Sequence, residues 1–190
     1  RGAFDADRSR RYLEACRAAG LALRLHADQF TESGAIPLAV ELGARSVDHL
    51  EATGPGGVAT LGASDVAAVL LPASALFLDR PMPPGRALVD AGAIVALATD
   101  FNPGSAYTTS LPLVCTLACT QLHLTPEEAL AAVTVNAAHV LGHSDRGRIA
   151  PGLRADLTLL DVPDWRYLAY RLAGDIVAAV VVEGAPALQR

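Results

Sequence analysis

Apolar residues form two kinds of run along this chain, one with a helical period and one short and continuous. Residues 7–19 place small and apolar side chains on one face of a helix, and Gly20 stands where such a helix ends. Residues 21–25 are a short apolar run typical of a buried strand, and the polar stretch from His26 to Gln29 follows it. The start of the chain therefore predicts a helix, then a strand that ends on polar side chains.

The same order of strand and helix recurs along the first hundred residues. The predicted helices are residues 33–42, a brief piece that follows a break at residues 54–57 and reaches Leu61, and residues 84–91; the predicted strands are residues 46–48, residues 66–71 up to Pro72, and the run that leads to Asp100. Four such units in series predict parallel strands joined by helices. A closed (β/α)8 barrel needs eight units and about 250 residues, so the predicted fold class is α/β, half of such a barrel.

The later part of the chain predicts two more helices and a small β layer. The expected elements are helices at residues 111–122 and 125–141 and strands at residues 157–161 and 176–182, with a turn-rich link at residues 147–156. Thr125 and Pro126 are typical of a helix start. We therefore divide the chain into residues 1–145, the barrel part, and residues 146–190, the β part.

Composition excludes several kinds of partner. The 190 residues are 52% hydrophobic and carry a net charge of −5 without a long basic run, so we expect no nucleic-acid partner. No apolar run reaches the ~18 residues of a membrane span, so we expect no membrane partner. Three cysteines, an odd number, indicate free thiols in the cytoplasm. Cys115 and Cys119 could share a helix face as metal or redox residues, but their apolar neighbours favour a place in the core.

Ionisable side chains stand where three predicted strands end, at His26, His49 and Asp100. Each alone has an ordinary interpretation, a turn cap for the Asp and a hydrogen-bonded side chain for the His. Together they favour one shared site, because the carboxyl ends of parallel strands meet at one edge. Imidazole and carboxylate suit zinc or a similar metal, but catalytic zinc needs three protein ligands. If His49 transfers protons, two ligands remain, and we expect the others upstream of this chain.

The remaining candidates have simpler explanations. His139 and His143 bracket a helix end, where an imidazolium can interact with the last carbonyl groups, and we favour this over metal binding. His123 falls in a turn between helices. The cluster from Gly54 to Gly57 lacks the Lys-Ser/Thr continuation of a phosphate-binding loop, so we expect an ordinary loop there.

Several segments resemble the imidazolonepropionases, a family of metal-dependent amidohydrolases. They are His26-Ala27-Asp28-Gln29-Phe30, Glu41-Leu42-Gly43-Ala44, Asp48-His49-Leu50, Leu70-Leu71-Pro72, the run from Ala96 to Ser105, Thr125-Pro126-Glu127-Glu128-Ala129 and Gly152-Leu153-Arg154-Ala155-Asp156-Leu157. The last motif recurs in many amidohydrolases and says little about substrate. The run Asp100-Phe101-Asn102-Pro103-Gly104-Ser105 is the specific one. The resemblance extends over nearly all 190 residues and implies the C-terminal half of an amidohydrolase barrel with part of a small β-sandwich domain.

The activity implied is that of a histidine-degrading hydrolase, which opens the ring of 4-imidazolone-5-propanoate to N-formimino-L-glutamate. The resemblance implies that His26 and Asp100 bind one zinc or iron ion. From the chemistry of a metal-activated water, we expect Asp100 to accept the proton of that water and His49 to steady the nucleophile or the developing oxyanion, so the catalytic candidates are His49, Asp100 and Gln29. The resemblance further implies substrate or product contacts from Gln29, Asn102, Gly104 and Ser105. Gln29 replaces a Glu of some relatives, which puts a proton-transfer role at this position in doubt. The resemblance is also compatible with a homodimer of the full-length protein.

Other interpretations follow from what the chain does not contain. The family has a His-x-His pair and further substrate-binding residues in its N-terminal half, and none of them is in this sequence. We therefore expect a fragment of a longer protein that is inactive alone. Another amidohydrolase, such as a deaminase or a cyclic-amide hydrolase, would share the metal and differ in the pocket. A truncated, non-catalytic homologue would bind little metal.

Overall fold

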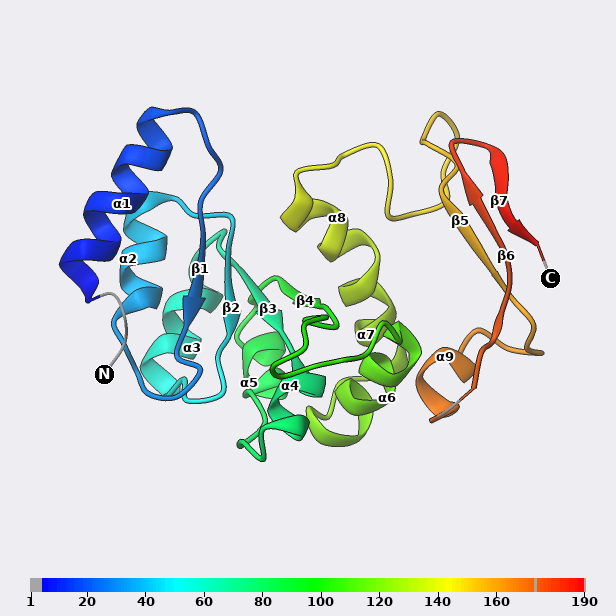
Figure 1. Ribbon diagram of the computed structural model, residues 1–190, viewed down its shortest axis with the longest axis horizontal. Coiled ribbons are helices and arrows are strands. Elements are labelled where there is room, and N and C mark those ends of the chain that lie inside the picture. The colour runs from blue at the N-terminus through cyan, green and yellow to red at the C-terminus, as the bar shows by residue number, and fades with distance from the viewer. Residues whose placement is uncertain (1–4, 173, 190) are drawn as a thin grey trace.

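The computed structural model describes residues 5–172 and 174–189. Its first part contains four short strands and five helices that alternate along the chain. These are α1 (Ala6–Ala18), β1 (Arg24–Ala27), α2 (Ala35–Leu42), β2 (Ser46–His49), α3 (Pro55–Gly62), β3 (Ala67–Leu70), α4 (Pro72–Phe77), α5 (Gly85–Asp90) and β4 (Val95–Leu97). Figure 1 shows these strands side by side, with α1, α2 and α3 packed along one side of the sheet.

The four strands form one parallel sheet in the order β1-β2-β3-β4, as the series of strand and helix units predicts. The register pairs Ala27 with His49 at the carboxyl ends of β1 and β2, and Leu70 with Leu97 further along the sheet. All four strands therefore end at the same edge. His26 lies near the end of β1, His49 is the last residue of β2 and Asp100 follows β4, so all three lie at or next to this edge.

The sheet packs differently on its two faces. On one face, alternate residues such as Leu70 and Leu97 join the main core formed with the helices. On the other face, Val69 and Ala96 belong to a smaller apolar cluster closed by Val140. In β1, in contrast, buried and exposed residues alternate, so only one face of that strand is covered within the described residues.

The structure differs from the sequence pattern at the start of α3, at Pro72 and within the helix predicted for residues 125–141. The predicted break at residues 54–57 is wrong, because Pro55 occupies the first turn of α3 and the glycines that follow continue the helix. The predicted end of the strand at Pro72 begins α4 in the same way. The single helix predicted for residues 125–141 is two helices, α7 (Pro126–Val133) and α8 (Val135–Leu141), separated at Thr134, whose φ of −121° and ψ of −90° are not helical.

Capping residues explain why several helices begin close to where the sequence predicts. Asp5 caps α1 by accepting the N–H of Arg8 at 2.8 Å. Thr125 and Glu128 form a capping box at the start of α7, in which each side chain accepts the backbone N–H of the other residue. The buried helix α6 (Leu111–Gln121) begins in a similar way, with Ser110 accepting the N–H of Leu113. These residues satisfy N–H groups that a helix leaves unpaired.

A second, antiparallel sheet follows at the end of the chain, at the opposite end of the molecule from α1 (Figure 1). It contains β5 (Leu157–Leu160), β6 (Val177–Val182) and β7 (Ala185–Gln189) in that order. The predicted pairing of the first two strands is confirmed. The third strand was not predicted, and neither was α9 (Tyr167–Tyr170), which packs against α6.

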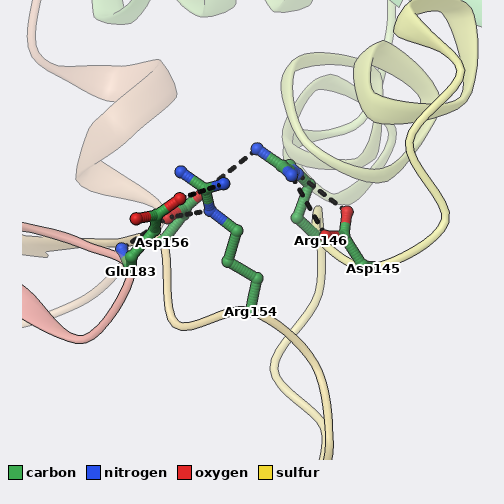
Figure 2. Close-up of polar contacts among 5 residues, drawn as sticks. All are labelled: Asp145, Arg146, Arg154, Asp156 and Glu183. Carbon is green, nitrogen blue, oxygen red and sulfur yellow. Dashed lines mark hydrogen bonds and ion pairs between the residues drawn. The ribbon is translucent and has the colours of Figure 1, made fainter.

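Ion pairs connect the link after α8 to this second sheet, as Figure 2 shows. Arg146 contacts Asp145 at 2.9 Å and Asp156 at 3.3 Å, and Arg154 contacts Asp156 at 2.8 Å and Glu183 at 2.6 Å. The Arg154 side chain, more than any other neighbour, lowers the pKa of Asp156. Through Arg154 and Asp156, the Gly-Leu-Arg-Ala-Asp-Leu segment thus connects the start of β5 to Arg146 and Glu183. The division of the chain at residue 145 stays a prediction.

No helix in the described residues has the length and apolar character needed to cross a membrane.

Candidate active site

The carboxyl edge of the parallel sheet holds residues in an unfavourable backbone conformation. Asp28, His49, Leu50 and Asp100 have φ values of 50°, 86°, 75° and 54°, in the left-handed region that non-glycine residues rarely adopt. Each such residue costs about 1–3 kcal/mol and persists only where the surrounding structure imposes it. Conformations of this kind concentrate at functional sites, and here all four lie where β1, β2 and β4 deliver their loops.

Two of the predicted site residues are in direct contact. The ring centroids of His26 and His49 lie 4.7 Å apart with their planes tilted by 42°. His26 is exposed, whereas the His49 side chain is only 2% exposed. Nδ1 of His49 lies 3.4 Å from Oε1 of Glu51, which is also buried. The edge therefore presents one accessible imidazole next to one enclosed imidazole.

Asp28, which is not among the predicted site residues, connects the loops after β1 and β2. Its Oδ1 accepts hydrogen bonds from the N–H and the hydroxyl of Ser33 at 2.8 and 3.0 Å, and its Oδ2 accepts one from the Thr53 hydroxyl at 3.2 Å. Its backbone carbonyl accepts the N–H of Ala52 at 2.7 Å. Gln29, half-buried, follows directly in the chain. Gln29 therefore follows a residue whose carboxylate and backbone are both hydrogen-bonded to neighbouring segments.

The loop after β4 brings four predicted site residues together. The Asn102 amide donates to the Asp100 carbonyl at 2.6 Å, and its oxygen accepts the N–H groups of Gly104 and Ser105 at 2.8 and 2.9 Å. The Ser105 hydroxyl donates to Oδ2 of Asp100 at 3.3 Å. The rings of Phe101 and Tyr107 contact each other at a tilt of 33°, with centroids 5.1 Å apart. The Asn-Pro-Gly-Ser sequence therefore forms a compact turn that holds the Asp100 carboxylate.

The predicted residues fall into two groups along the edge. One group is on β1 and β2, the other follows β4, and β3 lies between them. Within the described residues, no three His, Cys, Asp or Glu side chains lie close enough to hold a metal ion together. The assignment of His26 and Asp100 as ligands, and of His49, Gln29, Asn102, Gly104 and Ser105 as catalytic or binding residues, stays a prediction.

Asp48, which pairs with His26 across β1 and β2, is a further acidic residue beside this edge. Burial raises the pKa of Asp48, although the Ser46 hydroxyl, which donates to its Oδ1 at 3.1 Å, and the nearby His26 and Arg24 act in the opposite direction. The alternation of residues along β2 places it on the same sheet face as Ser46. The face that carries His26 thus also carries an acidic group.

The other sequence candidates occupy structural positions. Each cysteine is a free thiol in the described chain, and burial raises the pKa of Cys115 in α6 to about 12. His139 lies in the last turn of α8, as predicted, and His143 follows the helix end. His123 lies between α6 and α7 with a φ of 58°. These histidines lie outside the strand-end loops described above.

The fold and the sequence together define the class of protein. A model of the amidohydrolase family matches residues 2–187, and the chain belongs to this family. It is similar to the imidazolonepropionase of Rubrobacter xylanophilus, with 66% identity over 185 residues that cover 97% of this chain and 45% of the relative. It is also similar to the imidazolonepropionase of Deinococcus radiodurans, with 50% identity over 183 residues that cover 96% of this chain and 46% of the relative. The chain spans about half the length of the curated relatives it matches.

Solved structures confirm the predicted half-barrel. An adenosine deaminase from Xanthomonas campestris with bound zinc superposes with a TM-score of 0.83 at 21% identity, covering 97% of this chain and 49% of that chain. A 5-methylcytosine deaminase from Klebsiella pneumoniae superposes with a TM-score of 0.80 at 20% identity, covering 96% of this chain and 52% of that chain. At these identities the likeness establishes the fold, an α/β half-barrel followed by part of a small β domain.

Proposed function

We propose that the complete protein containing this chain hydrolyses 4-imidazolone-5-propanoate to N-formimino-L-glutamate, a step of histidine breakdown. The observation that carries the proposal is the Asp100 to Ser105 turn, which lies at the carboxyl edge of the sheet in a chain 66% identical to an imidazolonepropionase. Water adds across the ring amide in this reaction. The hydroxyl group bonds to the carbonyl carbon, the carbon–nitrogen bond breaks, and the proton goes to the leaving nitrogen.

We infer that one zinc or iron ion binds at this edge, with His26 and Asp100 as two of its ligands. The donors fit such an ion, because His26 offers an accessible imidazole and the half-buried Asp100 offers a carboxylate whose Oδ2 accepts a hydrogen bond from Ser105. A catalytic site takes three protein ligands, so the complete protein supplies further nitrogen ligands from outside this chain. The ion would lower the pKa of a water from about 15.7 to about 7 and polarise the substrate carbonyl.

The side chains of this chain divide the remaining work. Asp100 accepts the proton of the attacking water and passes it to the leaving nitrogen. His49 stabilises the oxygen of the substrate carbonyl as negative charge develops there. Ser105 and Gln29 contact the imidazolone ring, and Asn102 and Gly104 contact the ring-opened product. We place this small-molecule reaction in the cytoplasm, and a homodimer of the complete protein stays a prediction.

The test measures the loss of 4-imidazolone-5-propanoate and the formation of N-formimino-L-glutamate by the complete protein, in parallel with ammonia release from adenosine and cytosine. Turnover of the imidazolone alone supports the proposal, and ammonia release without it would replace the proposal with a deaminase function. Asp100→Asn should abolish turnover and reduce bound metal. His26→Ala should reduce bound metal, while the matched variant His123→Ala, in a turn between helices, should retain it.

A further inference from the structure

Glu51 is a buried carboxylate with unused hydrogen-bonding capacity. Its side chain is 1% exposed, and its Oε1 lies 3.4 Å from Nδ1 of His49. Its Oε2 has no hydrogen-bond partner among the described residues. A carboxylate removed from water without full compensation destabilises the fold, and such groups are rare outside sites where they serve a function.

The backbone around Glu51 holds its side chain beside His49. Two successive left-handed residues, His49 and Leu50, turn the chain so that the residue after them returns toward the imidazole. Leu50 donates its N–H to the Ala27 carbonyl at 3.0 Å, and Ala52 donates its N–H to the Asp28 carbonyl at 2.7 Å. The residues on both sides of Glu51 are therefore hydrogen-bonded to the last residue of β1 and to the residue that follows it.

Side chains near Glu51 also connect this segment to the rest of the fold. The Thr53 hydroxyl donates to Oδ2 of Asp28, and the Leu50 side chain is completely buried. Glu51 therefore has little freedom to leave His49. The strained turn and the burial of the uncompensated carboxylate both oppose folding. Together they place the Glu51 carboxylate as a hydrogen-bond acceptor beside Nδ1 of His49.

We propose that Glu51 is a positioning residue for His49. By accepting the Nδ1–H of the imidazole, it holds the ring in one orientation and leaves Nε2 as the nitrogen that faces the reacting groups. An Asp or Glu in this relation to a catalytic His stabilises the productive tautomer without touching the substrate. The inference rests on the proposed function, in which His49 stabilises developing charge on the substrate.

A structural role and a positioning role have opposite consequences for stability. If Glu51 stabilised the fold, replacing it would lower the unfolding midpoint. If it positions His49 at a cost to the fold, an apolar residue of similar volume should leave the midpoint unchanged or raise it, since the uncompensated buried carboxylate is gone. Glu51→Met removes both the charge and the acceptor, and Glu51→Gln removes the charge while it retains an amide oxygen.

The experiment compares these two variants with the complete wild-type protein and with Glu41→Gln, which removes an exposed carboxylate paired with Arg10 on the far side of α2. We expect Glu51→Met to lower kcat by about 100-fold with KM changed by less than about threefold, and Glu51→Gln to fall between it and wild type. Nitrogen-15 spectra of the His49 ring should show one tautomer in wild type and a mixture in Glu51→Met. Glu41→Gln should match wild type in kcat and KM, in the unfolding midpoint and in the His49 tautomer.

Three outcomes would overturn the inference: kcat near wild type in a folded Glu51→Met protein, a lowered unfolding midpoint in both Glu51 variants, or an unchanged His49 tautomer. If Glu51→Met does not fold, Glu51→Gln still decides, because its amide preserves the shape of the site. Failure of the proposed function is recognised separately, because the wild-type protein would then not hydrolyse 4-imidazolone-5-propanoate at all. The ring spectra would still report whether Glu51 fixes the tautomer.

Discussion

Two glycines in the same helix should respond in opposite directions to the same substitution. In α3, a Cβ on Gly62 would lie 2.4 Å from the carbonyl oxygen and 2.8 Å from the Cβ of Ala91, whereas a Cβ on Gly56 would meet no atom within 4 Å. Alanine at either position lowers the conformational entropy of the unfolded chain, which stabilises the fold by about 0.5–1 kcal/mol. At Gly62 the overlap with backbone atoms of Ala91 exceeds this gain, and overpacking of this kind costs about 1–3 kcal/mol.

The free energy of unfolding should therefore rise in Gly56→Ala and fall in Gly62→Ala. The measurement is urea unfolding of the complete protein followed by far-UV circular dichroism, with midpoint and slope determined for both variants. An equal slope would show that the change lies in the folded state. The steric argument would be refuted if both variants shifted the midpoint in the same direction.

Three further predictions concern the helices around the sheet. Thr125→Ala removes the hydroxyl that accepts the Glu128 N–H, so it should lower the free energy of unfolding by about 1 kcal/mol, measured by urea unfolding against Thr60→Ala as a control in the exposed part of α3. Arg86, which forms two hydrogen bonds to Glu128, and the Thr125 N–H lower the pKa of that carboxyl below its unfolded value. Its contribution is thus present above about pH 4.5 and lost as the pH falls through the folded pKa, so unfolding measured between about pH 5 and 3 should depend less on pH in Glu128→Gln; an unchanged slope would contradict the pairing. Burial raises the pKa of Cys115 to about 12, so iodoacetamide at about pH 8 should leave this thiol unmodified until urea unfolds the protein, as peptide mass spectrometry would show; modification in the folded state would place Cys115 outside the core.

The parallel half-barrel was predictable because its signals are local and repeated. Each strand is a short apolar run, and glycines such as Gly43 end helices in the left-handed conformation that favours this residue. The capping sequence at Thr125 predicted the start of α7 to the residue. Local chemistry of this kind acts within one turn of helix, so a single sequence contains it in full.

The errors arose where distant packing or a small backbone change decided the outcome. The break at Thr134 has no proline or glycine, and its hydroxyl bonds to the Leu130 carbonyl, so the pattern before and after it remained helical. The missed strand β7 follows Glu183 and Gly184, both with positive φ, which form the two-residue turn of a β-hairpin. This signal was present in the sequence, but the chain after it is short and only weakly alternating.

The candidate site likewise contains residues that the sequence predicts and residues that only the fold reveals. His26, His49 and Asp100 were selected because they follow strands, a rule that needs no contact information. Asp28 does not stand out in the sequence, because its importance depends on a hydrogen bond from Thr53, 25 residues further along the chain. Glu51 does not stand out because its burial beside His49 is a property of the folded chain. A buried carboxylate is visible only when the side chains around it are known.

The left-handed residues at the strand ends have a consequence for anyone who wishes to make this protein more heat-resistant. Libraries that search for stabilising substitutions reward the relief of backbone strain, and glycine or asparagine at positions 28, 49 and 100 would provide it. Selection on melting temperature alone would therefore remove the side chains at this edge first. A useful library should hold these three positions constant and draw its gains from surface sites such as Gly56, where nothing but solvent meets the new side chain.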